Sequence, residues 1–94
     1  MSAHHSRANF DASIVRELTG TVVDYSWRNP HVDMGVEVTE DSGKNRIWLI
    51  ESHSVTAMRR NGWGTGTLNI GDQATFSGSA DKNPKRPFLI LNYL

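Results

Sequence analysis

The pattern of hydrophobic and polar positions along the chain predicts a protein made mostly of short strands. The clearest one covers residues 31–39, where Val32, Met34, Val36 and Val38 alternate with polar or small residues. Alternation with a period of two places the apolar set on one face of an extended segment, as in a strand that is buried on one side. We therefore predict a half-buried strand at 31–39.

Four other segments have the composition of strands, at residues 14–27, 46–51, 73–80 and 88–94. The first is long and is interrupted by Gly20, and a glycine inside a strand often marks a bulge or a bend. Between the 31–39 and 46–51 strands, the segment EDSGKN has the composition of a hairpin turn, with Gly43 supplying a positive φ.

One short helix is predicted within residues 52–62. Ser52 or Ser54 can accept a hydrogen bond at its start, and Gly62 suits the left-handed position just past its end. Such an end forms a Schellman motif when two hydrophobic residues meet across it. Here those two residues would be Met58 and Trp63.

The resulting order is three strands, a helix and two strands, with a long, bent first strand. This is the order of an OB-fold, a five-stranded Greek-key barrel, and we predict an all-β OB-fold-like barrel with one short helix. An α+β open sheet with one helix is the alternative. Residues 1–13 are polar and aperiodic and are interpreted as an N-terminal arm on a single domain at 14–94.

The composition of the chain excludes several kinds of site and counts against several kinds of partner. The chain has 94 residues, ten basic and ten acidic side chains and no cysteine, which excludes disulfides and thiolate metal sites. Zero net charge gives no electrostatic reason to expect a nucleic-acid partner, so such a partner is unlikely. No apolar run is long enough to span a membrane. No serine stands in a GxSxG-like setting, and we expect a protein that is not an enzyme.

An antiparallel hairpin between the 31–39 and 46–51 strands would gather His31, Asp33, Glu51 and His53 at one end of the barrel. If the turn centres on Ser42, Asp33 lies opposite Glu51 and His31 opposite His53. If it centres between Ser42 and Gly43, Met34 lies opposite Glu51 instead. A shift of one residue also moves Trp48 between core and surface, and the sequence leaves both registers open.

The leading functional hypothesis is a copper or zinc site. Imidazole and carboxylate groups bind these metals, and the ligands we predict are His4, His5 and His31, with Glu51 as a fourth ligand or as a support. If Met1 is removed, the amine, two amide nitrogens and His4 could wrap square-planar Cu(II) or Ni(II). The structural alternatives stay open: His4 and His5 as solvated tail residues, His31 as a loop tie and Glu51 as a partner of backbone or arginine.

Two further hypotheses use other residues. In the first, the outer face of the 31–39 and 46–51 strands, with an exposed Trp48 and Arg46, holds a peptide, a glycan or an anionic ligand. Trp27 and the basic loop at 81–87, which carries Lys85 and Arg86, would contribute. In the second, the barrel binds single-stranded nucleic acid, which rests on fold analogy alone.

Several motifs resemble a family of short, secreted bacterial proteins of unknown function. They are AHHS followed by FD, then GTV, WRNPH, WLIE, RNGW and IGD, and they cover residues 3–72. The C-terminal stretch DKNPKRPFLILNYL matches less well, and His53 has no counterpart. Members typically carry a signal peptide that ends just before the His-His-Ser. The resemblance therefore implies a periplasmic or secreted protein whose arm and NPH loop act together, with no established activity.

Overall fold

The computed structural model describes residues 15–83 and 85–92. Within that part of the chain it has five strands and one short α-helix. These are β1 (Arg16–Ser26), β2 (Asp33–Thr39), β3 (Asn45–Glu51), α1 (Val55–Arg60), β4 (Gln73–Ala80) and β5 (Phe88–Leu91). The predicted elements are confirmed in type and order, with ends that differ by at most three residues.

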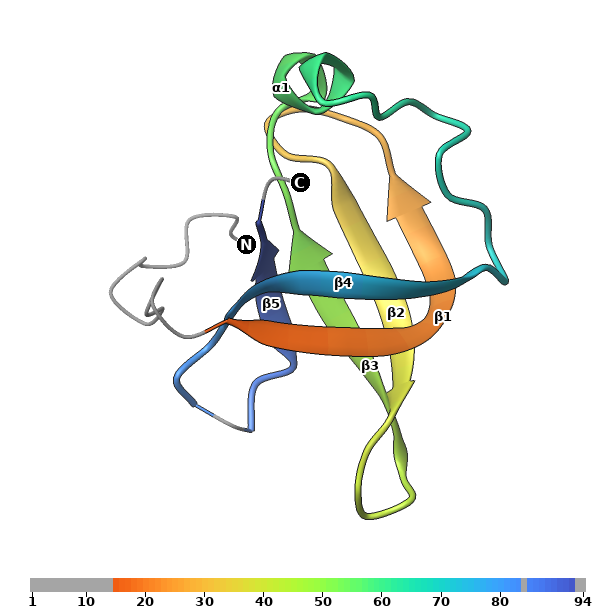
Figure 1. Cartoon of the computed structure of the whole chain (residues 1–94), viewed down its shortest axis with the longest axis vertical. Coiled ribbons are helices and arrows are strands. Elements are labelled where there is room, and N and C mark those ends of the chain that lie inside the picture. Colours follow the sequence, from red (N-terminus) through yellow and green to blue (C-terminus); the bar gives the residue numbers. More distant parts are fainter. Residues whose placement is uncertain (1–14, 84, 93–94) are drawn as a thin grey trace.

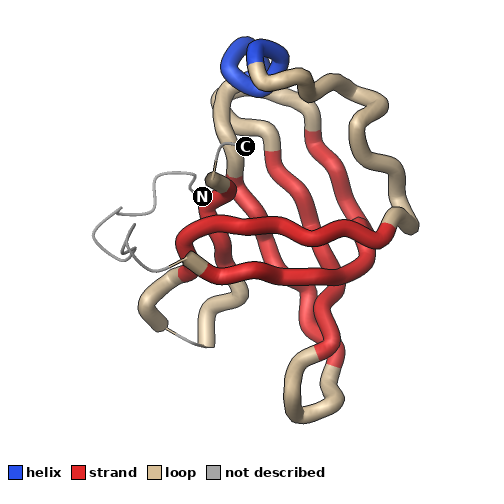
Figure 2. Tube along the Cα trace, viewed as in Figure 1, coloured by secondary structure: helices blue, strands red, loops and turns tan. Residues whose placement is uncertain are grey.

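The five strands form a closed barrel in the order β1-β2-β3-β5-β4. β1 pairs with β4 to close it, β3 and β5 run parallel, and the other neighbours are antiparallel. α1 lies between β3 and β4 in the chain and covers one end of the barrel (Figures 1 and 2). The OB-fold-like prediction is confirmed, and closure of the barrel rules out the open sheet.

β1 is long because it belongs to both halves of the barrel. Its first part, Arg16–Thr21, pairs with β4, and its second part, Thr21–Ser26, pairs with β2. Gly20 sits where the strand changes partner, and a Cβ there would lie 2.2 Å from the Glu37 carbonyl oxygen. The sequence predicted a bend at this glycine, and the accompanying β-bulge lies nearby, between Val22 and Asp24.

The β2–β3 hairpin adopts the register centred on Ser42, with Asp33 opposite Glu51 and Val36 opposite Trp48. Trp48 therefore points into the barrel and is only 2% exposed. The hypothesis that needed an exposed Trp48 on the outer face is wrong on this point, because a buried apolar set on β2 fixes the register of its partner. The outer face of β3 instead carries Ile47 and Leu49, which are 50% and 45% exposed.

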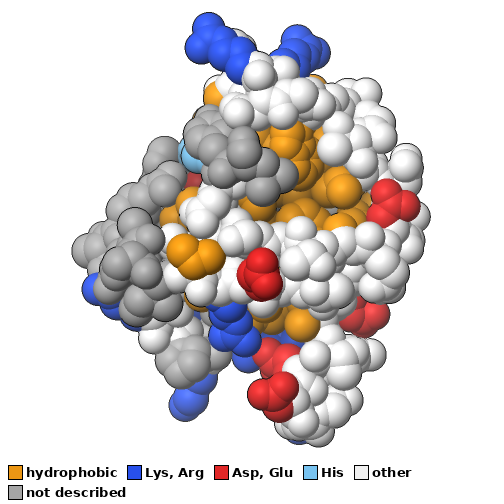
Figure 3. Space-filling model, in the orientation of Figure 1, with side chains coloured by type: hydrophobic (Ala, Val, Ile, Leu, Met, Phe, Trp, Pro, Cys, Tyr) orange, Lys and Arg blue, Asp and Glu red, His pale blue; other side chains and the backbone are white. Residues whose placement is uncertain are grey.

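The core fills the barrel and continues under α1, whose Met58 is fully buried. Ser54 caps the helix by accepting a hydrogen bond from the Ala57 N–H. At the other end, the Trp63 and Gly62 N–H groups donate to the Met58 and Arg59 carbonyls, which is the predicted Schellman motif. Figure 3 shows hydrophobic side chains in the hollow between α1 and β4.

Residues 15–83 and 85–92 contain no helix that is both long and apolar enough to cross a membrane.

Candidate functional site

Three of the motifs noted in the sequence, WRNPH, WLIE and RNGW, meet at one end of the barrel. Trp27, Asn29 and His31 belong to the β1–β2 connection, Glu51 is the last residue of β3, and Trp63 follows α1. The β1–β2 connection and α1 lie together at the top of Figure 1. We call this region the helix end of the barrel.

The β1–β2 connection is tied to α1. The Asn29 side-chain oxygen accepts a hydrogen bond from the Val55 N–H at 3.0 Å, so it caps the helix together with Ser54. The Arg59 guanidinium lies 6.0 Å from the centre of the Trp27 ring, within cation–π range. These contacts hold the connection in one place and thereby position the residue that follows Pro30, His31.

His31 and Glu51 form the central contact of the helix end. Nδ1 of His31 lies 3.2 Å from Oε1 of Glu51. The Glu51 residue is 5% exposed, and Nδ1 is shielded from solvent and forms no hydrogen bond in the described ranges, so it meets Glu51 at ion-pair distance only. The His31 side chain as a whole is 26% exposed. His31 thus turns Nδ1 toward a buried carboxylate while part of its side chain stays accessible.

Asp33 adds a second carboxylate beside this pair, because it lies directly opposite Glu51 in the β2–β3 ladder. Burial is the main cause that raises the pKa of Asp33 above its ordinary value, and the Glu51 charge raises it further. His31 and Arg28 oppose this by lowering the pKa. Two neighbouring carboxylates thus lie beside His31, and this pair favours a proton or a cation at that point of the helix end.

The four predicted metal ligands are only partly placed. His31 and Glu51 are in contact, whereas His4 and His5 lie outside the described residues. Among residues 15–83 and 85–92, no three His, Asp, Glu or Cys side chains are grouped so that they could hold a metal ion. A metal site at the helix end would therefore need ligands from elsewhere in the chain.

His53 takes part in the backbone pairing of this end. It is half-buried two residues before α1, and its backbone carbonyl accepts a hydrogen bond from the Val32 N–H. This bond extends the β2–β3 ladder toward His31.

The basic loop lies at the opposite end of the barrel, beside the start of β3. Arg46 donates to the Lys85 carbonyl oxygen and forms an ion pair with Glu40 at 3.4 Å. Arg86 lies 3.5 Å from the buried carboxylate of Asp81. Arg46 and Arg86, which were predicted to bind a ligand, thus hold the loop in place. They lie at the opposite end of the barrel from Trp27 and do not form one site with it.

The Trp48 side chain fills the interior of the barrel at this opposite end. The Arg16 and Arg46 guanidinium groups lie 5.0 and 6.0 Å from its ring centre. Sequence reasoning missed Arg16 and also missed Asn29 as a helix cap. An Asn-Pro pair before a distant helix gives no local signal of capping, because the contact exists only once the barrel has closed.

The fold and the helix end together define a small OB-like barrel in which a partly exposed histidine meets a buried carboxylate at the helix end. The chain belongs to DUF6152, a family of unknown function, whose sequence model matches residues 1–89. This match reaches into β5, beyond residue 72 where the resemblance seen in the sequence weakened. Comparisons with curated proteins and with solved structures give no match.

Proposed function

We propose that this protein is a small, non-catalytic binding protein of the periplasm or the secreted fraction, and that it binds one Cu(II) or Zn(II) ion at the helix end. The location follows from its resemblance to secreted proteins. The binding role follows from the chemistry of His31 and Glu51.

The observation that carries this proposal is the orientation of the His31 ring. A histidine that binds a metal commonly donates its other ring N–H to a carboxylate, which fixes the tautomer and makes the free nitrogen a better ligand. The Glu51 carboxylate lies 3.2 Å from Nδ1, and we propose that it accepts this hydrogen bond when the metal is bound. Nε2 is then the metal ligand, and Glu51 supports it without touching the metal.

His4 and His5 would supply the remaining ligands. A single imidazole from the folded barrel is not a metal site, and zinc usually takes four ligands. Two adjacent histidines near the amino terminus, together with His31, give three imidazoles from a chain that contains four. Sharing ligands between arm and barrel would explain why both motifs occur in the same sequence.

Calorimetric titration with Zn(II) and Cu(II) tests the proposal, on protein with the native amino terminus as defined by mass spectrometry. Replacing His4, His5 and His31 together by alanine is expected to abolish micromolar binding of both metals. The matched control is His53→Ala, which removes the fourth histidine and should leave both affinities within about twofold. Unchanged affinity in the triple variant contradicts the proposal.

Titration with Zn(II) also distinguishes a site shared by the arm and the barrel from a chelate formed by the amino terminus alone. A terminal amine and amide nitrogens suit square-planar Cu(II) rather than tetrahedral Zn(II). For Zn(II), His31→Ala alone should weaken binding at least tenfold. If His31→Ala has no effect while the His4 and His5 pair remains essential, the metal is not bound at the helix end.

A further inference from the structure

The two strands β1 and β2 separate at the end of the barrel opposite to α1. Their ladder runs from Ser26 and Asp33 only as far as Thr21 and Glu37. Beyond this point the first part of β1 turns to pair with β4, while the end of β2 continues beside β3. The two strands therefore diverge from a common point.

Gly20 marks that point. A Cβ at this position would lie 2.2 Å from the Glu37 carbonyl oxygen, so the two backbones approach each other closely there. From Gly20 toward the start of β1 they move apart, which leaves a wedge between them.

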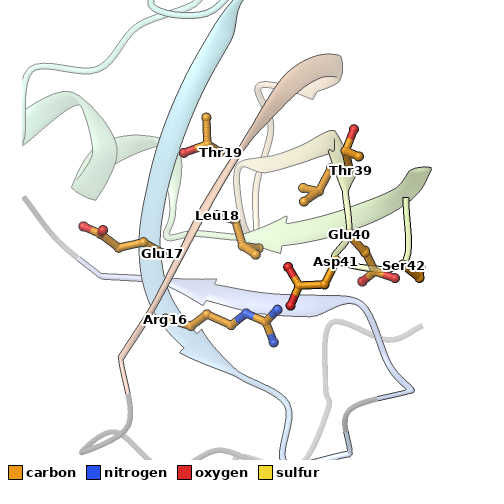
Figure 4. A pocket seen from close by; sticks show the side chains of 9 residues that line it. Arg16, Glu17, Leu18, Thr19, Thr39, Glu40, Asp41 and Ser42 are labelled. Atoms are coloured by element: carbon orange, nitrogen blue, oxygen red, sulfur yellow. The ribbon is translucent and has the colours of Figure 1, made fainter. Parts of the chain in front are cut away.

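The wedge is a hollow of about 530 Å³. One wall is β1 from Arg16 to Thr19, and the other is the end of β2 with the start of the hairpin turn, residues 38–42. Figure 4 shows the side chains of both walls around it. Leu18 and Val38, which are 4% and 8% exposed, connect the hollow to the core. Ligand sites in proteins typically enclose roughly 300–1,000 Å³.

Within the part of the chain that the structure describes, both walls of this hollow are free strand edges. Residues 16–20 of β1 pair with β4 on one side only, and Val38 and Thr39 pair with β3 on one side only. A strand edge presents main-chain N–H and C=O groups without ladder partners, and it can accept another strand. Four consecutive residues, Arg16–Thr19, form the longer of the two edges.

The mouth of the hollow has Arg16 on the β1 wall and Asp41 on the other, while the neighbouring Glu17 points to the opposite side of β1 (Figure 4). Arg16 extends from β1 toward the wall that bears Asp41, as Figure 4 shows. Within residues 15–83 and 85–92 neither Arg16 nor Asp41 forms an ion pair, whereas Glu40 pairs with Arg46. A bound chain would thus meet a cation on one side, which stacks on Trp48 but has no ion-pair partner in these ranges, and a carboxylate without an ion pair on the other.

We propose that this groove binds an extended peptide segment of another protein, about four residues long, which adds to the free edge of β1 as a further strand. Main-chain hydrogen bonds would supply the affinity, as in other cases of strand addition. Alternate side chains of the added strand would point toward Leu18 and Val38, and near the mouth of the groove toward Arg16, which lies on the same face of β1 as Leu18, and toward Asp41 on the other wall. The groove lies at the opposite end from His31, so this proposal does not depend on metal binding.

The first test is an NMR titration of the full chain with a blocked pentapeptide of alternating threonine and valine. We expect chemical-shift changes at the amides of Arg16–Thr19 and of Val38 and Thr39, with the rest of the spectrum unchanged. Two N-methylated versions of the peptide serve as controls, each lacking alternate N–H donors. Because an added strand donates alternate N–H groups to one edge, one version should lose at least about tenfold in affinity and the other much less.

Two outcomes would overturn the proposal. One is the absence of shifts at these amides at millimolar peptide. The other is equal binding of all three peptides, or equal shifts with free amino acids, since recognition would then not involve a strand.

A second test uses the charges. Peptides whose central residue is lysine or glutamate should respond oppositely to Asp41→Asn and Arg16→Gln, with each variant weakening only the peptide of opposite charge by a fewfold. Each variant is the other's control, and the neutral peptide checks that the groove is intact. Equal effects on both charged peptides would contradict the assigned role of Arg16 and Asp41.

Discussion

Glu51 is the residue on which the helix end most depends, because a buried carboxylate needs a partner. His31 is that partner, at 3.2 Å. Replacing Glu51 by alanine leaves the Nδ1 of His31 shielded and unpaired, which costs about 2–3 kcal/mol of unfolding free energy. Glu51→Gln keeps the volume and an acceptor oxygen, and it should cost roughly half as much. Urea unfolding of both variants measures this, and equal stability of the alanine variant and the wild type would contradict it.

Tyr25 provides a test of pH dependence. Its hydroxyl donates to the Gly64 carbonyl oxygen at 2.6 Å, and burial raises its pKa above the ordinary value near 10, with an opposing hydrogen bond to Thr67. Because the unfolded chain loses this proton first, stability is full below pH 10 and falls as the pH rises through the folded-state pKa.

Tyr25→Phe should therefore flatten the loss of stability above pH 10, while costing about 1 kcal/mol at pH 7 through the lost hydrogen bond. Absorbance titration of tyrosinate in a Tyr93→Phe background reports Tyr25 alone, since the chain has two tyrosines. A titration midpoint at or below the ordinary value would contradict the expected shift.

At the level of elements, α1 depends on its caps because it has only six residues. Helices of this length are not stable alone in water. Gly62 ends α1 with a φ of 87°, which side chains with a Cβ disfavour. Gly62→Ala should cost about 1 kcal/mol. Gly66 has an ordinary φ and open space around it, so Gly66→Ala is the matched control and should be neutral or slightly stabilising. Thermal unfolding distinguishes the two, and equal effects would contradict the role of Gly62.

The elements could be predicted well because their signals are local. β4 was predicted at its observed bounds, and the Schellman contact between Met58 and Trp63 followed from spacing alone. The register of β2 and β3 could not be chosen, since a turn centred on Ser42 and one centred half a residue later suit the same composition. Burial of Val36 and Trp48 on one face decides it, and burial is a property of the closed barrel.

For the whole molecule, closure depends on two glycines where backbones cross. A Cβ at Gly20 or Gly78 would lie 2.2 or 2.1 Å from the carbonyl oxygen of Glu37 or Ile90. Alanine at either position forces the strands apart and should cost about 3 kcal/mol or more. Gly35, where the nearest atom would be the Cβ of Asp24 at 3.2 Å, is the control and should lose less than about 1 kcal/mol. Similar losses for all three would contradict this account of closure.

The candidate site could be predicted only in part, because some of its contacts exist only in the closed barrel. The hairpin geometry placed Asp33 and Glu51 at one end of the barrel from sequence, and the structure has the one of the two open registers in which they lie directly opposite. Two other features depend on contacts between segments far apart in the chain. One is that His31 faces Glu51 through Nδ1, and the other is that β1 leaves β2 beyond Gly20 and opens a groove. No local pattern of residues encodes such contacts.

The tautomer of His31 gives the most direct test of the proposed metal site. Long-range ¹H–¹⁵N NMR of the histidine rings reports which nitrogen carries the proton, before and after addition of Zn(II). The account predicts that Nδ1 of His31 stays protonated toward Glu51 while Nε2 takes the shift of a metal-bound nitrogen, and that His53 is unchanged. Saturation with Zn(II) that leaves both His31 nitrogens where they were would contradict it.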